Sequence, residues 1–121
     1  MADIRPFRAL RYNLEKAGDI QDLTCPPYDI ISEEQRQEYL SRNGYNLIRL
    51  ELPKEGEDPY EEANRVLAKW REEQILCLDM EPGLYLYEEE FLSKVDRGEM
   101  KKVRGLVCRV RLEDFKNGVV L

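Results

Sequence analysis

The 121-residue sequence contains no histidine. Histidine is the general base of Ser-His-Asp and Cys-His catalysis and a common zinc ligand, so these chemistries are excluded within the chain. The three cysteines, Cys25, Cys77 and Cys108, lie far apart and form no CxxC pair, which argues against a zinc site and a disulfide framework. Reduced thiols in a cytoplasmic protein fit this usage best. We expect Cys77 and Cys108, each in an apolar run, to be buried as small hydrophobic residues.

Glycine-rich phosphate loops and long apolar runs are also missing. Neither GxGxxG nor GxxxxGK[ST] occurs among the seven glycines, which argues against Walker-type or Rossmann-type nucleotide binding and leaves no cofactor expected in this chain. No apolar run approaches the roughly 20 residues that span a bilayer, and the N-terminal segment does not resemble a signal peptide. The net charge of −6 argues against nucleic acid or an anionic membrane as a partner.

Two helices are predicted from local capping signals. Ser32 followed by Gln35 matches a capping box, so a helix is expected over about 33–42. Asp58 is a good N-cap residue and is followed by proline and glutamate, so a second helix is expected over roughly 59–74. Both helices should contribute an apolar side to a common core.

Strands are predicted from alternation. Residues 4–12 read as an edge strand, because Pro6 cannot donate a ladder hydrogen bond. Residues 46–52 alternate apolar and charged side chains at period two and give the clearest strand pattern. Residues 83–92 and 100–112 flank a turn-like segment at 96–99 and predict an antiparallel hairpin.

These elements predict one α+β domain over residues 1–121, with a small mixed or antiparallel sheet of four or five strands and two helices packed on one face. The apolar ending after Asn117-Gly118 reads as a strand that begins there, so we interpret the chain as the N-terminal fragment of a longer protein. An unpaired strand edge would then allow homo-oligomers to form. The expected core joins one face of the strand at 46–52 to the second helix: Ile48, Leu50, Leu52, Tyr60, Leu67 and Trp70.

The segment Cys25–Asp29 (CPPYD) is the first candidate site. Two prolines fix the backbone, so Tyr28 and Asp29 would lose little entropy on binding a ligand. These two residues are therefore candidates for substrate binding. Alternatively, the prolines only route the chain into the following helix, with Tyr28 in the core and Asp29 capping a turn.

Arginines on the predicted strands form the second candidate, because the guanidinium fork binds phosphate and carboxylate. Arg8 and Arg49 are the substrate-binding candidates, and the alternative is cross-strand pairing with glutamates. Glu88 and Glu90 share one strand face and could chelate a hard cation, or they could be a solvated strand edge. The full set of strand arginines is Arg5, Arg8, Arg11, Arg49, Arg104, Arg109 and Arg111.

Several stretches together resemble the N-terminal part of an uncharacterised prokaryotic family, the domain-of-unknown-function family 1015: IRPFRALRYN, CPPYDIIS, YNLIRLELP, DPYEEA, LYLYEEEF and RGLVCRVRLEDFKNGVVL. The resemblance implies a longer protein that continues into an Asp-Gly-His-His-Arg motif. That motif is similar to one in the ParB/sulfiredoxin-like fold, which includes nucleotide-dependent free-serine kinases. No position of this chain matches it, so no catalytic residue is assigned here.

Two functions therefore stay open. In the first, the chain is the N-terminal domain of an enzyme that acts on a small anionic metabolite, with nucleotide-dependent phosphoryl transfer completed by residues of the remainder of its own chain. In the second, it is a non-catalytic binding or protein-interaction module. A downstream Asp-Gly-His-His-Arg stretch would favour the first.

Overall fold

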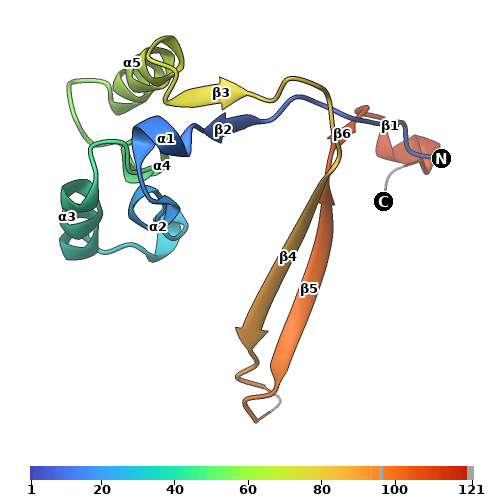
Figure 1. Cartoon of the computed structure of the whole chain (residues 1–121). Helices are drawn as coiled ribbons and strands as arrows, with labels where there is room; N and C mark the ends of the chain where they lie inside the picture. Colours follow the sequence, from blue (N-terminus) through green and yellow to red (C-terminus); the bar gives the residue numbers. More distant parts are fainter. Residues whose placement is uncertain (96, 120–121) are drawn as a thin grey trace. The chain divides into compact units, whose positions relative to one another are not determined.

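A computed structural model describes residues 1–95 and 97–119. Residue contacts divide the chain into two compact units (Figure 1). We call Leu10–Leu78 the helical unit, and Met1–Ala9 with Asp79–Leu121 the strand unit. The single-domain assignment stays a prediction.

The helical unit carries the helices of the chain's first two thirds, joined to one short antiparallel ladder in which Leu10 pairs with Leu78. In chain order its elements are β2 (Leu10–Tyr12), α1 (Leu14–Ala17), α2 (Ile20–Leu23), the 3₁₀ turn η1 (Tyr28–Ile30), α3 (Glu33–Arg42), α4 (Ile48–Glu51), α5 (Pro59–Glu72) and β3 (Leu76–Leu78).

Both predicted helix starts are confirmed. At α3 the Ser32 hydroxyl accepts from the Gln35 backbone N–H at 3.2 Å, and the Gln35 side chain accepts from the Ser32 N–H at 2.9 Å. At α5 the Asp58 carboxylate accepts from the N–H groups of Tyr60 and Glu61. These caps involve residues within three positions of each other, which is why sequence alone locates them.

The strand predicted over 46–52 is wrong, because residues Ile48–Glu51 form the short helix α4. Asn46 is fully buried, and its side-chain carbonyl accepts from the Ile48 N–H at 2.9 Å. Its amide donates to the carbonyls of Asp22 and Thr24 at 2.7 and 3.1 Å, which fixes the start of the helix against the end of α2. Apolar residues at 48 and 52 suit one helical face as well as one strand face, so period two was ambiguous here.

The core lies in the helical unit, and the predicted meeting of α4 with α5 is confirmed in part. Ile48 and Trp70 are buried, and Leu50 and Leu67 pack against the core. Tyr60, however, is 82% exposed; it lies in the first turn of α5, about two turns before Leu67. The Trp70 ring also contacts the rings of Tyr12 and Tyr45, with centroids 6.2 and 5.8 Å away.

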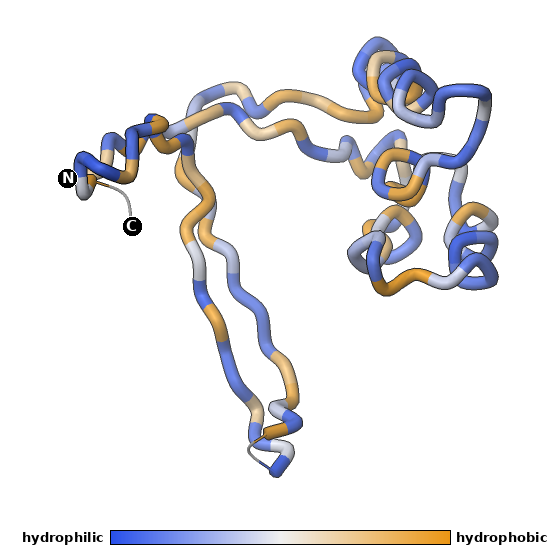
Figure 2. Tube along the Cα trace, turned by 180° about the vertical axis from the view of Figure 1, so that it is seen from behind, coloured by the Kyte–Doolittle hydropathy of each residue, from blue (hydrophilic) through white to orange (hydrophobic). Residues whose placement is uncertain are grey.

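The strand unit confirms the predicted hairpin. Strands β4 (Tyr85–Leu92) and β5 (Met100–Val107) pair antiparallel in unbroken register from Tyr85↔Val107 to Leu92↔Met100. Figure 2 shows hydrophilic residues in the middle of this hairpin and hydrophobic ones toward its base. Part of the predicted turn at 96–99 and most of the strand expected after Gly118 fall on residues 96 and 120–121, outside the described residues.

The single sheet of four or five strands is wrong. Within the described residues the strands form three antiparallel sheets of two strands each: β1 (Ile4–Arg5) with β6 (Arg109–Val110), β2 with β3, and β4 with β5. The predicted strand at 4–12 is divided between β1, a bridge from Phe7 to Gly83, and β2, because Pro6 has no N–H to continue the ladder. The last helix described in the strand unit is the 3₁₀ turn η2 (Phe115–Asn117).

The cysteines are free thiols in the described residues, but the predicted burial of Cys77 and Cys108 is wrong. Each is half-buried: Cys77 lies in β3, where a two-stranded ladder covers a residue less completely than a wide sheet does, and Cys108 lies between β5 and β6.

Candidate functional site

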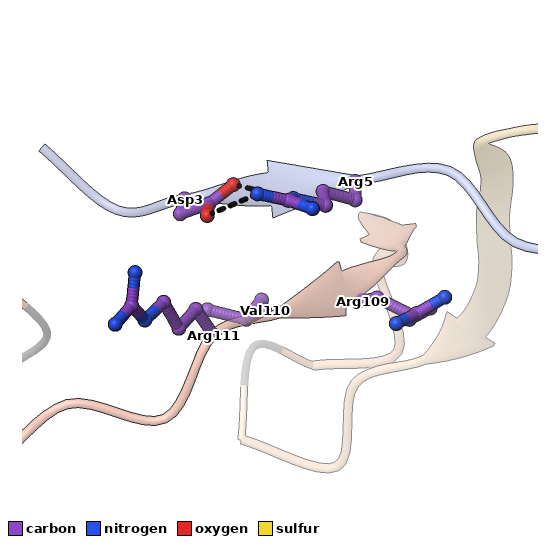
Figure 3. A pocket seen from close by; sticks show the side chains of 5 residues that line it. All are labelled: Asp3, Arg5, Arg109, Val110 and Arg111. Atoms are coloured by element: carbon purple, nitrogen blue, oxygen red, sulfur yellow. Dashed lines mark hydrogen bonds and ion pairs between the residues drawn. The ribbon is translucent and has the colours of Figure 1, made fainter.

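Arginines gather on one face of the β1–β6 ladder. Arg5 pairs directly with Arg109, and the Arg111 N–H donates to the Asp3 carbonyl at 3.0 Å, which places Asp3 opposite Arg111. Because side chains alternate along a strand and paired residues share a face, these four side chains lie on one face. With Val110 they line a surface pocket of about 320 Å³ (Figure 3). We call this set the arginine face.

Asp3 neutralises only one of the three arginines. Its two carboxylate oxygens accept from Nε and Nη2 of Arg5, both at 3.1 Å. This hydrogen-bonded pair holds the pKa of Asp3 below its usual value and raises the pKa of Arg5. Arg111 lies 3.5 Å from the Glu113 carboxylate, outside the pocket lining. Asp3 therefore acts as an internal anion on one side of the arginine face.

Arg109 has no hydrogen-bond or ion-pair partner among residues 1–95 and 97–119. Like charges directly opposite each other destabilise an antiparallel pair, so Arg5↔Arg109 is an unfavourable arrangement for the isolated ladder. In Figure 3 the two guanidinium groups point apart, that of Arg5 toward Asp3 and that of Arg109 away from it. The guanidinium group of Arg109 is therefore the one suited to an added phosphate or carboxylate, which the guanidinium fork binds with two parallel hydrogen bonds.

The predicted candidate Arg8 lies in the same unit but does not line this pocket. Its Nε donates to the Asp79 carbonyl at 2.5 Å. The Asp79 carboxylate in turn accepts from the Tyr85 hydroxyl at 2.5 Å, and the Tyr85 ring lies 5.1 Å from that of Phe7. In this structure Arg8 joins the first segment of the strand unit to the second.

The other predicted candidates lie in the helical unit. Tyr28 and Asp29 fall in η1, both exposed, with Tyr28 at 61%, so the alternative that places Tyr28 in the core is wrong. Arg49 is half-buried and donates to the carbonyls of Leu40 and Asn43 at 3.1 and 3.0 Å, which satisfies the last turn of α3. It lines a second pocket of about 340 Å³ that includes neither Tyr28 nor Asp29, and the full lining is Leu40, Arg49, Glu55, Glu62 and Val66.

Cys25 next to the proline pair is not an activated thiol. Burial, followed by the nearby Glu51 carboxylate, raises its pKa, which lowers the fraction of reactive thiolate. Burial also raises the pKa of Tyr12 to about 12, and the Tyr12 hydroxyl donates to the Tyr45 carbonyl at 2.7 Å. Cys25 and Tyr12 therefore have structural roles and offer no reactive group for catalysis.

The hairpin confirms the cross-strand pairing of acids with bases. Arg104 Nε lies 2.6 Å from Glu88, and Lys102 Nζ lies 3.1 and 2.7 Å from Glu88 and Glu90. The two glutamates predicted as a possible cation chelate are thus each bound by a cation of the protein itself. Within the described part of the chain no group of three or more acidic, histidine or cysteine side chains could hold a metal ion.

Sequence reasoning included Arg5, Arg109 and Arg111 among the strand arginines but did not single them out. Their proximity depends on the register between β1 and β6, which are separated by about one hundred residues. No pattern of neighbouring residues in the sequence predicts that register. None of the helices in the described ranges is long and apolar enough to cross a bilayer.

Comparison with known proteins gives one family. The family model described as protein of unknown function (DUF1015) matches residues 4–121. Neither the curated proteins nor the solved structures gave a match. The match covers nearly the whole chain and agrees with the resemblance carried by its CPPYDIIS and YNLIRLELP segments, so the chain belongs to the DUF1015 family of proteins of unknown function.

Proposed function

We propose that this chain binds a small anionic metabolite through the arginine face and contributes that site to an enzyme. The reaction we propose is nucleotide-dependent phosphoryl transfer, with the nucleotide and the reacting groups held by residues outside this chain. We place the enzyme in the cytoplasm, in keeping with the three free thiols.

One observation carries the proposal. Arg5 and Arg109 are directly opposed across an antiparallel ladder, and Arg109 has no anionic partner in the described ranges. Three guanidinium groups and one carboxylate line the pocket, so it keeps an excess of positive charge although the chain as a whole carries −6. A bound phosphate or carboxylate would reduce the repulsion between the two arginines and accept hydrogen bonds from the guanidinium fork of Arg109, since the fork of Arg5 already binds Asp3.

The test is a titration of the ¹⁵N-labelled chain with inorganic phosphate, ATP and a set of amino acids and carboxylates, followed by amide chemical shifts. We expect saturable shifts confined to the amides of β1 and β6. Arg109→Gln should abolish them. The matched control is Arg71→Gln, which removes the same charge from an exposed position of α5 in the helical unit and should leave binding unchanged.

Two results would count against the proposal: shifts spread over all basic residues, or equal loss of binding in both variants. Either would mean that general charge, and not the arginine face, attracts the anion. Release of ADP from ATP by the longer protein, in the presence of the metabolite, tests the phosphoryl-transfer part separately.

A second candidate function is a protein-interaction module without a small-molecule site. The exposed hairpin favours it, because Leu86 and Leu106 are 74% and 53% exposed at a paired position of β4 and β5. Large apolar side chains grouped on one exposed face are typical of surfaces that bind another protein.

A further inference from the structure

The β4–β5 hairpin has no third strand paired to it within residues 1–95 and 97–119. Both of its faces carry exposed large apolar residues. An isolated two-stranded hairpin is only marginally stable in water, because it buries too little apolar surface to offset the ordering of its backbone. A protein surface that covers one face would therefore stabilise it.

One of the two faces has a layered composition. The register places four cross-strand pairs on it in the order apolar, charged, charged, apolar. We call it the layered face, and its pairs are Leu86↔Leu106, Glu88↔Arg104, Glu90↔Lys102 and Leu92↔Met100. All its acids belong to β4 and all its bases to β5, and the ion pairs of 2.6 to 3.1 Å between them confirm that the charged side chains share this face.

We propose that the layered face binds the same face of a second copy of this chain, with the two hairpins parallel about a two-fold axis that runs along them. In that arrangement β4 of each copy lies over β5 of the other. Glu88 then meets the partner's Arg104, and Glu90 meets the partner's Lys102. The two apolar layers also meet, so the face is complementary to itself.

The charge pattern disfavours the other two-fold arrangements of this face and of the strand edges. An antiparallel face-to-face dimer places β4 over β4, so carboxylates meet carboxylates. Pairing of two β4 edges or two β5 edges gives the same repulsion, since the middle of β4 is acidic and that of β5 is basic. Association through this face is distinct from the expected association through an unpaired strand edge, which stays a prediction.

The size of the face limits the strength of the dimer. Strands of eight residues at about 3.4 Å per residue, lying about 4.8 Å apart, give a face of about 27 Å by 10 Å. Stable complexes bury roughly 800 Å² per partner. We therefore expect a weak, reversible dimer that forms at high protein concentration.

A charge-swapped variant tests the arrangement. The variant carries four changes: Glu88→Lys, Glu90→Lys, Lys102→Glu and Arg104→Glu. It keeps every acid–base pair within the hairpin but moves the acids to β5 and the bases to β4. Wild type and the swapped variant should each dimerise in sedimentation velocity over a concentration series. In native mass spectrometry of a mixture, we expect mixed dimers at about one tenth of their statistical share, because like charges then meet across the interface.

Two single variants identify the face. Leu106→Ser should abolish dimerisation, whereas Phe91→Ser, which also replaces a large apolar side chain by serine but on the opposite face, should not. Circular dichroism shows whether each variant is folded. A wild type that stays monomeric, mixed dimers at their statistical share, or loss of dimers with Phe91→Ser alone would each overturn the proposal. None of these readouts depends on anion binding, so the arginine face is tested separately.

Discussion

The β1–β6 ladder and the β4–β5 hairpin lie in the same unit and use the same kinds of residues in opposite ways. In the hairpin, Glu88 is opposite Arg104 and Glu90 is opposite Lys102, so these four charges are neutralised across the ladder. In the shorter ladder Arg5 is opposite Arg109. The first pattern stabilises a solvated sheet, and the second is unfavourable unless an anion joins it. A strand arginine therefore indicates a binding site when its cross-strand partner fails to neutralise it.

The largest effect is expected at an arginine that is both buried and fully paired. Arg36 is 3% exposed, and its guanidinium donates to the Leu52 carbonyl at 3.0 Å and to Glu55 at 2.5 Å. Arg36→Ala should lower the free energy of unfolding by about 3 kcal/mol, because the substitution leaves a cavity in place of a buried side chain and the half-buried Leu52 carbonyl loses its donor. Urea denaturation measures this. Arg65→Ala, at an exposed i,i+3 pair with Glu62, is the control and should cost less than about 1 kcal/mol.

The next effect concerns the unneutralised pair. Arg109→Glu gives the β1–β6 ladder the opposite-charge pattern of the hairpin. Affinity for phosphate should fall by about tenfold or more, while hydrogen-exchange protection of the β1 and β6 amides should hold or increase. Titration calorimetry and exchange measured by NMR give the two readouts. If hydrogen-exchange protection falls together with phosphate affinity, Arg109 is a structural residue. The claim that its unneutralised charge marks a binding site would then be wrong.

The converse change gives the hairpin a like-charge pair. Arg104→Glu should destabilise β4–β5 locally by about 0.5–1 kcal/mol, seen as faster hydrogen exchange of its amides at protein concentrations below dimer formation. The double variant Glu88→Arg with Arg104→Glu restores an opposite-charge pair and should recover most of the loss. Failure of this rescue would show that position 104 acts through something other than its charge.

A smaller effect is expected when the internal anion is removed. Asp3→Asn frees the Arg5 fork and should raise the affinity for sulfate by up to about fivefold, since an exposed ion pair is worth about 0.2–1 kcal/mol. Calorimetric titration of both proteins measures the ratio. An unchanged affinity would mean that Asp3 does not compete with the bound anion.

The same ratio has a defined pH dependence. The pKa of Asp3 is lowered by its hydrogen bond from Arg5, so the carboxylate stays ionised down to below its ordinary value of 3.8. Its pairing with Arg5 is present above that value and is lost as the pH falls through the lowered pKa. Between pH 5 and 8 the wild type and Asp3→Asn should therefore differ by a constant factor, and a factor that changes over this window would contradict the assignment.

What sequence could and could not predict follows from how far the interacting residues lie apart. The Ser32 capping box and the Asp58 cap were predicted because each involves neighbours within three residues. The segment at 46–52 was misread because the burial of Asn46 depends on Asp22 and Thr24, more than twenty positions away. The arginine face depends on a register between the two ends of the chain. None of the four predicted site residues lines that face. The sequence indicated arginine as the binding residue type, but it did not show which arginines lie side by side across the ladder.

The boundary between the two units has a consequence for how this chain can be altered. Leu10 pairs with Leu78 on one side of it, and the Asp79 N–H donates to the Ala9 carbonyl at 2.8 Å on the other. Directly paired strand residues lie only about 5 Å apart. The helical unit thus begins and ends at two residues that pair with each other, as an insert with adjacent ends does. Such a segment can be excised, replaced by a two-residue turn or transplanted into another scaffold. Ligand binding can then be measured for each unit separately.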